Sequence, residues 1–273
     1  MTRAYRLLNV FALPGDPFSG NPLAVVEDAD GLSTQACQAI ARQFNLSEST
    51  FVTAGDGGTD ATVRIFTPTI ELPFAGHPTL GTAAVVAERA GREQVVLGMP
   101  AGPIPVALAD GRWTLTANPA TVAVADLPGE TLAAMLGLEQ ADLGAASAIE
   151  GAAVGAVAAE PPAHWVDAGI RQLLVQVRDA DAVRRVTPDA PLLRRTAMTP
   201  SGEALAYVWA WTGPDTLEAR LFFSQDTAVV EDPATGSACA NLGSLWAHQG
   251  RRDLHVRVSQ GQAVARPSLL HIT

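Results

Sequence analysis

Short apolar runs with alternating or β-branched residues recur along the chain and predict β-strands. Clusters rich in Gly, Pro, Asn and Asp separate many of these runs, as expected for turns between strands. The predicted strands lie at 6–13, 23–27, 49–53, 61–67, 171–179, 204–212, 217–224 and 264–272. An Asp-Gly pair at 110–111 also predicts a hairpin over 106–117, because this dipeptide favours a tight two-residue loop.

Three further segments have the character of helices, and two of them are apolar on nearly every face. Residues 33–44 form an amphipathic pattern with Ser33 as N-cap, and Cys37 falls on its apolar face. Residues 78–89 and 237–249 consist almost entirely of small or apolar side chains. A helix of this composition is buried on all sides. Each is therefore predicted to be enclosed by strands.

The two buried helices belong to an internal repeat. In both halves a strand carrying an arginine is followed by a loop, the pattern Pro-x-x-Gly and a small-residue helix. Arg64 and Arg220 lie 156 residues apart, whereas Gly76 and Gly236 lie 160 apart, so the second loop is four residues longer. We therefore predict an α+β fold of two similar lobes, each a curled, mostly antiparallel sheet or barrel around a central buried helix.

The lobe boundary is predicted from a change in pattern after the hairpin. We assign 1–120 to the N-terminal lobe and 121–261 to the C-terminal lobe, and expect the final segment, 262–273, to pack back on the first lobe. Residues 117–163 are rich in Ala, Gly, Pro and acids. Within them, 150–164 has the composition of a loosely ordered connection.

The composition of the chain excludes several classes of function. The 273-residue chain has a net charge of −10 and no basic cluster, which argues against a nucleic-acid partner. No apolar run is long enough for a membrane span, and the N-terminus has no signal-peptide core, so a cytoplasmic protein is expected. All 18 basic residues are arginine. The absence of lysine excludes a pyridoxal-phosphate Schiff base, a P-loop and a class I aldolase.

The two cysteines, Cys37 and Cys239, have neither a CxxC nor a metal-ligand spacing. Each lies in a predicted helix, where a core packing role is expected. The sequence therefore predicts neither a metal nor an organic cofactor.

The starts of the two buried helices are candidate anion sites. The first turn of a helix has unpaired N–H groups and the positive end of the helix dipole. Gly76 precedes His77 at one start and Gly236 precedes Ser237 at the other, and glycine allows a ligand to approach the backbone closely. Two such ends facing each other across a cleft would bind a small carboxylate. The alternative is that the glycines serve only the turns.

Titratable residues accompany these helix starts. Glu48 lies between Leu46 and Phe51, where partial desolvation would raise its carboxyl pKa and suit it for proton transfer. The alternatives are a solvated or capping acid at Glu48, a histidine that only bonds backbone at His77, and an N-cap-like turn residue at Asp232. Glu231 has no argument in its favour over a solvated acid.

Five stretches resemble the phenazine-biosynthesis isomerase (PhzF-like) family. They occur in order along nearly the whole chain, and the combination of the third and fourth is specific. The stretches are DPFSGNPLAVV at 16–26, FNLSESTFV at 44–52, VRIFTPTIELPFAGHPTLGTA at 63–83, EDPATGSA at 231–238 and QGQAVARPS at 260–268. The resemblance implies the diaminopimelate-epimerase fold, with two lobes and an active site between them.

The resemblance also implies roles for individual residues. Glu48 would shuttle a proton on a cyclic, diene-type carboxylic acid, while His77 and Asp232 would hold and polarise substrate groups. The backbone around Gly76 and around Ser237, which follows Gly236, would bind the substrate carboxylate. A homodimer is expected by resemblance only.

Related racemases and epimerases use two facing cysteines, whose positions would fall near Pro73 and Pro233 here. Proline has no proton to exchange, and Cys37 and Cys239 lie elsewhere in the sequence. The main hypothesis is therefore a cofactor-independent isomerase that moves a proton within a small cyclic carboxylic acid. The alternatives are a non-catalytic binder of small anions and an amino-acid or hydroxy-acid epimerase.

Overall fold

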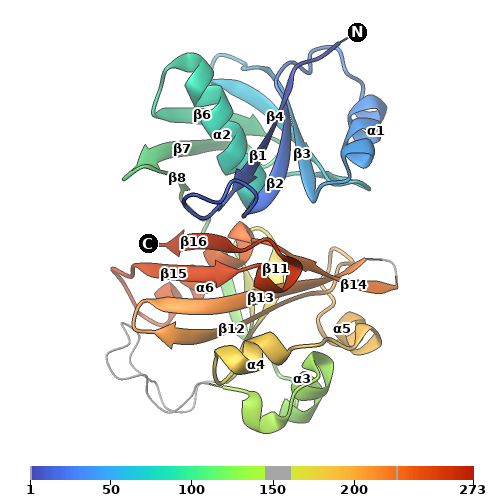
Figure 1. Ribbon diagram of the computed structural model, residues 1–273, viewed down its shortest axis with the longest axis vertical. Helices are drawn as coiled ribbons and strands as arrows, with labels where there is room; N and C mark the ends of the chain where they lie inside the picture. The colour runs from blue at the N-terminus through green and yellow to red at the C-terminus, as the bar shows by residue number, and fades with distance from the viewer. Residues whose placement is uncertain (1, 145–160, 226) are drawn as a thin grey trace. The chain divides into compact units, whose positions relative to one another are not determined.

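A computed structural model describes residues 2–144, 161–225 and 227–273. The chain divides into two compact units, Met1–Thr116 and Ala117–Thr273 (Figure 1). Most of the predicted connection at 150–164 lies outside the described residues. The part of 117–163 that is described contains regular elements, which the sequence pattern did not predict: strand β9 (Thr121–Val124), helix α3 (Gly129–Leu136) and the short 3₁₀ helix η1 (Gln140–Asp142).

The first unit contains an eight-stranded, mostly antiparallel sheet. Its order is β1-β2-β3-β4-β6-β7-β8, with β5 paired to β4. Only β2–β3 and β4–β6 are parallel pairs. The strands are β1 (Tyr5–Val10), β2 (Asn21–Val26), β3 (Glu48–Ala54), β4 (Ala61–Phe66), β5 (Glu71–Leu72), β6 (Gln94–Met99), β7 (Gly102–Ala109) and β8 (Arg112–Leu115).

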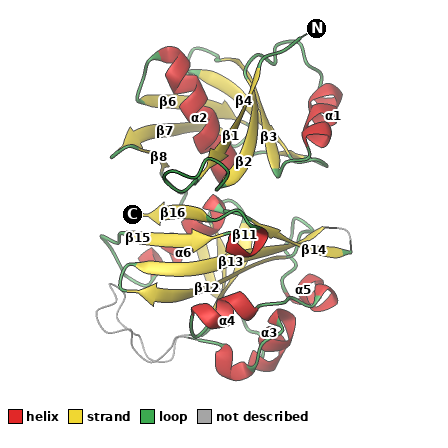
Figure 2. Ribbon diagram, viewed as in Figure 1, coloured by secondary structure: helices red, strands yellow, loops and turns green. Residues whose placement is uncertain are grey.

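Helix α2 (Gly76–Ala90) is the buried axis of this unit. It contacts β1 and β8, the two ends of the sheet, as well as β2, β3 and β6, so the sheet curves around it (Figure 2). Close packing requires Gly81, where a β-carbon would lie 2.6 Å from Leu23 Cδ2. The prediction of a helix enclosed by strands is confirmed, although the helix begins two residues before the predicted start at 78.

Helix α1 (Thr34–Phe44) covers the opposite face of the sheet and contacts β3 and β4. The predicted N-cap is confirmed, because Ser33 Oγ accepts a hydrogen bond from Ala36 N–H. Side-chain alternation assigns successive strand residues to the two faces. Val63 and Ile65 face α2, whereas Phe66 packs in the cluster that contains Cys37 of α1.

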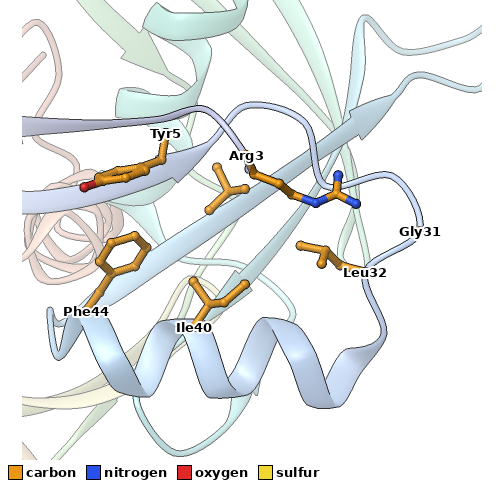
Figure 3. Close-up of a pocket in the computed structure, with 7 residues that line it drawn as sticks. Arg3, Tyr5, Gly31, Leu32, Ile40 and Phe44 are labelled. Carbon is orange, nitrogen blue, oxygen red and sulfur yellow. The ribbon is translucent and has the colours of Figure 1, made fainter. Parts of the chain in front are cut away.

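A pocket of about 470 Å³ opens between the beginning of β1 and α1 (Figure 3). The rings of Tyr5 and Phe44 meet at one end, with centroids 5.1 Å apart. At the other end, Arg3 donates hydrogen bonds to the carbonyl oxygens of Asp28 and Asp30. The pocket contains none of the residues predicted to form the functional site and belongs to the packing of α1.

The second unit also contains an eight-stranded sheet, in the order β16-β15-β13-β12-β11-β10-β9 with β14 paired to β13. Its further strands are β10 (Ala163–Asp167), β11 (Arg171–Gln176), β12 (Leu205–Gly213), β13 (Thr216–Gln225), β14 (Ala228–Asp232), β15 (Val256–Gln260) and β16 (Ser268–Ile272). Helix α6 (Gly236–His248) contacts β10, β11 and β16, while α4 (Ala180–Arg185) and α5 (Ala190–Thr196) pack on its central strands. The short 3₁₀ helix η2 (Gln262–Val264) precedes β16.

The internal repeat extends to the hydrogen-bonding order of the sheets. From β1 to β7, the successive pairs of the first sheet are antiparallel, parallel, antiparallel, parallel and antiparallel. The same sequence describes β10, β11, β12, β13, β15 and β16. The first buried helix lies between β5 and β6 and the second between β14 and β15. The prediction of two similar lobes around central helices is thereby confirmed.

The structure corrects the placement of the C-terminal segment. Strand β16 does not return to the first sheet but pairs antiparallel with β15, from Val256 opposite Ile272 to Gln260 opposite Ser268. The repeat explains this position, because β16 is the counterpart of β7 and completes the second sheet.

The repeated arginines hold equivalent positions. Arg64 forms a two-point ion pair with Glu71 and lies over the Phe66 ring at 4.9 Å. Arg220 pairs with Glu231 at 2.6 Å and lies over Phe222 at 4.7 Å. The expectation that Glu231 is a solvated acid is therefore wrong: its side chain is 8% exposed and paired.

Candidate active site

In the first unit, the structure brings Glu48 and His77 together. Glu48 is the first residue of β3, and His77 is the second residue of α2. Glu48 Oε2 and His77 Nε2 lie 3.5 Å apart, and the side chains are 17% and 6% exposed, respectively. A carboxyl group and an imidazole are thus enclosed at the start of the buried helix, beside Gly76.

Burial keeps the His77 ring neutral. Desolvation lowers its pKa to about 3, and a hydrogen bond to the Pro22 backbone opposes this shift only partly. Proline has no N–H, so the Pro22 group must be the carbonyl oxygen and the imidazole must be the donor. Nε2 makes no hydrogen bond within the described part of the chain. Nδ1 therefore holds the proton, and Nε2 presents a lone pair.

This tautomer determines what can lie between the two side chains. A lone pair on His77 Nε2 facing a carboxylate oxygen is repulsive. The contact becomes favourable when Glu48 carries a proton, or when an N–H or O–H group of a ligand lies against both acceptors. The two side chains can therefore share a proton held by Glu48 or hold a donor group of a ligand between them, which is compatible with acid–base chemistry at Glu48.

The two buried helices begin without side-chain caps. Their N-cap residues are Ala75 and Thr235, and neither side chain caps a helix N–H group. Gly76 and Gly236 are the first helical residues, so neither helix has a β-carbon at its first position. The N–H groups and the positive ends of the helix dipoles at these positions are suited to an anion, and binding of an anion there stays a prediction.

In the second unit, Asp232 is held at the end of β14 by a small hydrogen-bonded cluster. Thr235 Oγ1 donates to Asp232 Oδ2 at 2.5 Å and accepts from Gln260 Nε2 at 2.9 Å. The same Gln260 nitrogen donates to the Asp232 carbonyl oxygen at 2.9 Å. Gln260 is fully buried, and its two bonds fix the hydroxyl of Thr235 as a donor to the carboxylate.

Gly261 makes this cluster geometrically possible. Its φ of 85° lies in the left-handed region, and a β-carbon there would lie 2.4 Å from the Pro233 carbonyl oxygen. The turn after β15 can therefore approach the 231–238 loop closely. Sequence reasoning missed Gln260 and Thr235 as site residues, although both lie within the stretches that carry the family resemblance.

Ser237 is the second residue of α6, and its Oγ accepts a hydrogen bond from Gln172 Nε2 at 3.1 Å. Gln172 is 1% exposed on strand β11, where the apolar residues Leu173, Leu174 and Val175 follow it. Sequence reasoning also missed this residue. A glutamine within a β-branched and leucine-rich run was the available signal, because a buried polar side chain requires a partner.

The cysteines are structural. Burial raises the pKa of Cys239 to about 12, and its Sγ lies 3.7 Å from the hydroxyl of Tyr207 in the core. Burial also raises the pKa of Cys37, which lies on the buried face of α1. Protonated, enclosed thiols are unsuited to a two-thiol epimerase. Pro73 and Pro233 occupy the loops that lead into the two buried helices.

Within the ranges that the structure describes, no three His, Cys, Asp or Glu side chains cluster in a way that could hold a metal ion. Among the same residues, no helix combines the length and apolar character that crossing a bilayer requires.

The chain is similar to known proteins over nearly its whole length. The family model described as phenazine biosynthesis-like protein matches residues 8–273. An uncharacterized isomerase of Pasteurella multocida is 36% identical over 98% of this chain and 85% of its own length. The trans-2,3-dihydro-3-hydroxyanthranilate isomerase of Pseudomonas fluorescens is 35% identical over 97% of this chain and 88% of its own.

Solved structures extend the likeness to the fold. A PhzF-family protein of Bacillus anthracis has a TM-score of 0.79 at 23% identity, covering 99% of this chain and 90% of its own. A hydroxyproline epimerase of Agrobacterium vitis has a TM-score of 0.52 at 14% identity, covering 99% and 84%, and shares the fold alone.

The fold, with two similar units that each enclose a buried helix, defines a protein of the diaminopimelate-epimerase-like architecture. Within that architecture, the chain belongs to the phenazine biosynthesis-like (PhzF) family. The predictions of this family and of the isomerase class are confirmed.

Proposed function

We propose that this protein is a cofactor-independent isomerase that moves a proton between two carbons of a small cyclic carboxylic acid. The substrate is trans-2,3-dihydro-3-hydroxyanthranilate or a closely similar unsaturated ring acid. The observation that carries the proposal is the enclosed pair of Glu48 and His77, 3.5 Å apart, with the imidazole neutral.

Glu48 acts as the acid–base group. Its carboxylate takes a proton from one ring carbon, the electron pair of that C–H bond moves into the conjugated system, and a proton is returned to a second carbon. The atoms and electrons of substrate and product balance, so the reaction needs no oxidant or reductant. Enclosure at 17% exposure limits the access of water to the proton while Glu48 holds it.

The other predicted residues bind and polarise the substrate. His77 Nε2 accepts a hydrogen bond from an N–H or O–H group of the ring, and Asp232, oriented by Thr235, binds a second donor. The first-turn N–H groups at either helix start, around Gly76 in the first unit or around Gly236 and Ser237 in the second, are suited to the carboxylate. Their dipoles also stabilise the negative charge that spreads from the ring carbon during proton transfer.

The test is the kinetics of Glu48→Gln, with trans-2,3-dihydro-3-hydroxyanthranilate as first substrate. The amide keeps the shape of the side chain but cannot accept the proton, so kcat is expected to fall by roughly 10³-fold or more. Glu71→Gln is the matched control, because that acid belongs to the same unit but pairs with Arg64. Turnover by the Glu48 variant at the wild-type rate would reject the role of Glu48.

A further inference from the structure

A chain of hydrogen-bonded side chains leads from the β10–β11 turn to Ser237. Asn241 Oδ1 accepts from the Ala168 N–H at 2.8 Å, and Asn241 Nδ2 donates to the Ile170 carbonyl oxygen at 2.9 Å. Asn241 Nδ2 also donates to Gln172 Oε1 at 2.8 Å, and Gln172 Nε2 donates to Ser237 Oγ at 3.1 Å. Asn241 is fully buried and Gln172 is 1% exposed.

Every bond in this chain has a fixed direction. A backbone N–H can only donate and a carbonyl oxygen can only accept, so the turn determines which end of the Asn241 amide is oxygen and which is nitrogen. The nitrogen of Asn241 then requires an oxygen on Gln172. The remaining nitrogen of Gln172 must donate, and it reaches Ser237.

The hydroxyl of Ser237 is therefore left with a proton to donate. Its oxygen accepts from Gln172 and, within the described residues, makes no other hydrogen bond. Ser237 lies in the first turn of α6, beside the N–H groups of the proposed carboxylate site. An acceptor bound there would receive both backbone N–H and serine O–H donors.

We propose that Gln172 and Asn241 are positioning residues that commit the Ser237 hydroxyl to donate a hydrogen bond to the substrate carboxylate. The inference rests on the proposed function, since it requires a carboxylate at the start of α6. Gln172 and Asn241 would thereby determine specificity. They make Ser237 select a ligand group that accepts a hydrogen bond over one that donates it.

The first unit shows that the fold does not itself require this polar pair. In the first unit, Leu23 precedes Ala24, and Ala24 pairs with Ser49 on the neighbouring strand. In the second unit, Gln172 precedes Leu173, and Leu173 pairs with Ala206. Ser49 and Ala206 in turn lie opposite the repeated residues Phe66 and Phe222. Leu23 is thus the counterpart of Gln172.

Gly81 is the counterpart of Asn241 at the 160-residue offset, and it packs directly against Leu23. The same site in the repeat is therefore filled by an apolar contact in one unit and by two buried amides in the other. Because the first unit fills this place without polar groups, we attribute the two buried amides of the second unit to function rather than to a requirement of the fold.

The experiment compares binding of anthranilate, a non-reacting ring carboxylate, to the full chain and its variants by calorimetry. Ser237→Ala is expected to raise Kd about 10-fold or more, the effect of losing one hydrogen bond to a charged group. Gln172→Glu offers Ser237 an acceptor in place of a donor, which diverts the hydroxyl proton from the ligand. It is expected to raise Kd by at least as much as Ser237→Ala, whereas Gln172→Met has a smaller effect.

We call the hydrogen-bonded chain from Asn241 through Gln172 to Ser237 the relay. The double variant Gln172→Glu/Ser237→Ala separates the effect of this relay from simple charge repulsion. The negative charge of Gln172→Glu repels the ligand with or without a hydroxyl at 237, but the diverted proton matters only when Ser237 is present. The effect of Gln172→Glu should therefore be about 5-fold or more smaller in the Ser237→Ala background. Equal effects in both backgrounds would overturn the relay while leaving the proposed function intact.

Two further outcomes are decisive. Anthranilate binding that is undetectable in the wild type, or unchanged in Ser237→Ala, would overturn the carboxylate site and the relay with it. Should Gln172→Glu fail to fold, the side-chain amide resonances of Gln172 provide the second measurement. They should shift on adding anthranilate to the wild type and not to Ser237→Ala; an equal shift in both proteins overturns the relay.

Discussion

The two helix starts occupy equivalent positions in the repeat, yet they are built for different tasks. At the start of α2, Glu48 and His77 face each other at 3.5 Å outside hydrogen-bonding geometry. At the start of α6, Thr235 and Ser237 are each held by a buried glutamine. The first arrangement is suited to a proton that moves between groups. The second holds hydrogen-bond donors and acceptors in fixed orientations.

The strand register identifies which equivalent residues differ between the two units. Glu48 precedes Ser49 on β3, and Leu205 precedes Ala206 on β12, so Leu205 is the counterpart of the proposed acid–base group. On the neighbouring strands the polarity is reversed, with Leu23 in the first unit and Gln172 in the second. At these matched positions, each unit thus has one polar side chain, Glu48 in the first unit and Gln172 in the second. One scaffold thus carries its polar groups on different strands in the two units, and the proposed function assigns the reactive group to the first unit alone.

The largest stability difference is expected between the two repeated arginines. Arg220 and Glu231 are 13% and 8% exposed, whereas Arg64 and Glu71 are 31% and 29% exposed. Removing one partner of a buried pair leaves an uncompensated charge, so Arg220→Gln should cost roughly 3 to 5 kcal/mol and Arg64→Gln about 1 kcal/mol. Urea unfolding of both variants measures this. Equal losses would contradict the assignment of Arg220 as the more deeply buried anchor.

A pH-dependent difference is expected from His77. Its pKa is about 3 in the folded chain and near its ordinary value of 6.5 when unfolded, so the unfolded state binds the extra proton between these values. Stability is therefore retained above pH 6.5 and declines as pH falls, by up to about 1.4 kcal/mol per pH unit from this group.

His77→Gln should flatten that slope, and urea unfolding between pH 4.5 and 8 is the measurement. The exposed His248 near the end of α6 supplies the control His248→Gln. A slope unchanged by the His77 substitution would show that the imidazole is not buried as a neutral ring.

A smaller catalytic effect is expected at Thr235. Thr235→Val removes the hydroxyl that orients Asp232 and should lower kcat/KM about 10-fold, whereas Thr235→Ser keeps the hydroxyl and should restore most of the activity. Loss of activity in both variants, measured alongside their unfolding temperatures, would indicate a packing role instead.

The sequence predicted the repeated framework well because its signals are local. An apolar helix, a Pro-x-x-Gly turn and a strand arginine each have a short-range pattern, and their spacing revealed the repeat. The final strand was misplaced because strand partners depend on contacts between distant segments, which periodicity does not specify. The repeat itself contained the correct answer, since β16 completes the counterpart of the first sheet.

Prediction of the site was uneven for a similar reason. Glu48, His77 and Asp232 lie beside recognisable turns, so the sequence indicates where each lies relative to the nearest strand or helix. Gln172, Asn241 and Gln260 lie within strands or a helix, and their roles depend on which amide end faces which partner. Glu231 was misjudged because its ion pair with Arg220 crosses between strands.

The most direct test of the account is the fate of the substrate hydrogen in D2O, followed by NMR for the wild type and Glu48→Gln. The wild type is expected to convert trans-2,3-dihydro-3-hydroxyanthranilate to a product in which one ring carbon bears deuterium or the transferred hydrogen, and the variant is expected to form neither product on the same timescale. Equal conversion with the same labelling by Glu48→Gln would contradict the central claim that Glu48 moves the proton.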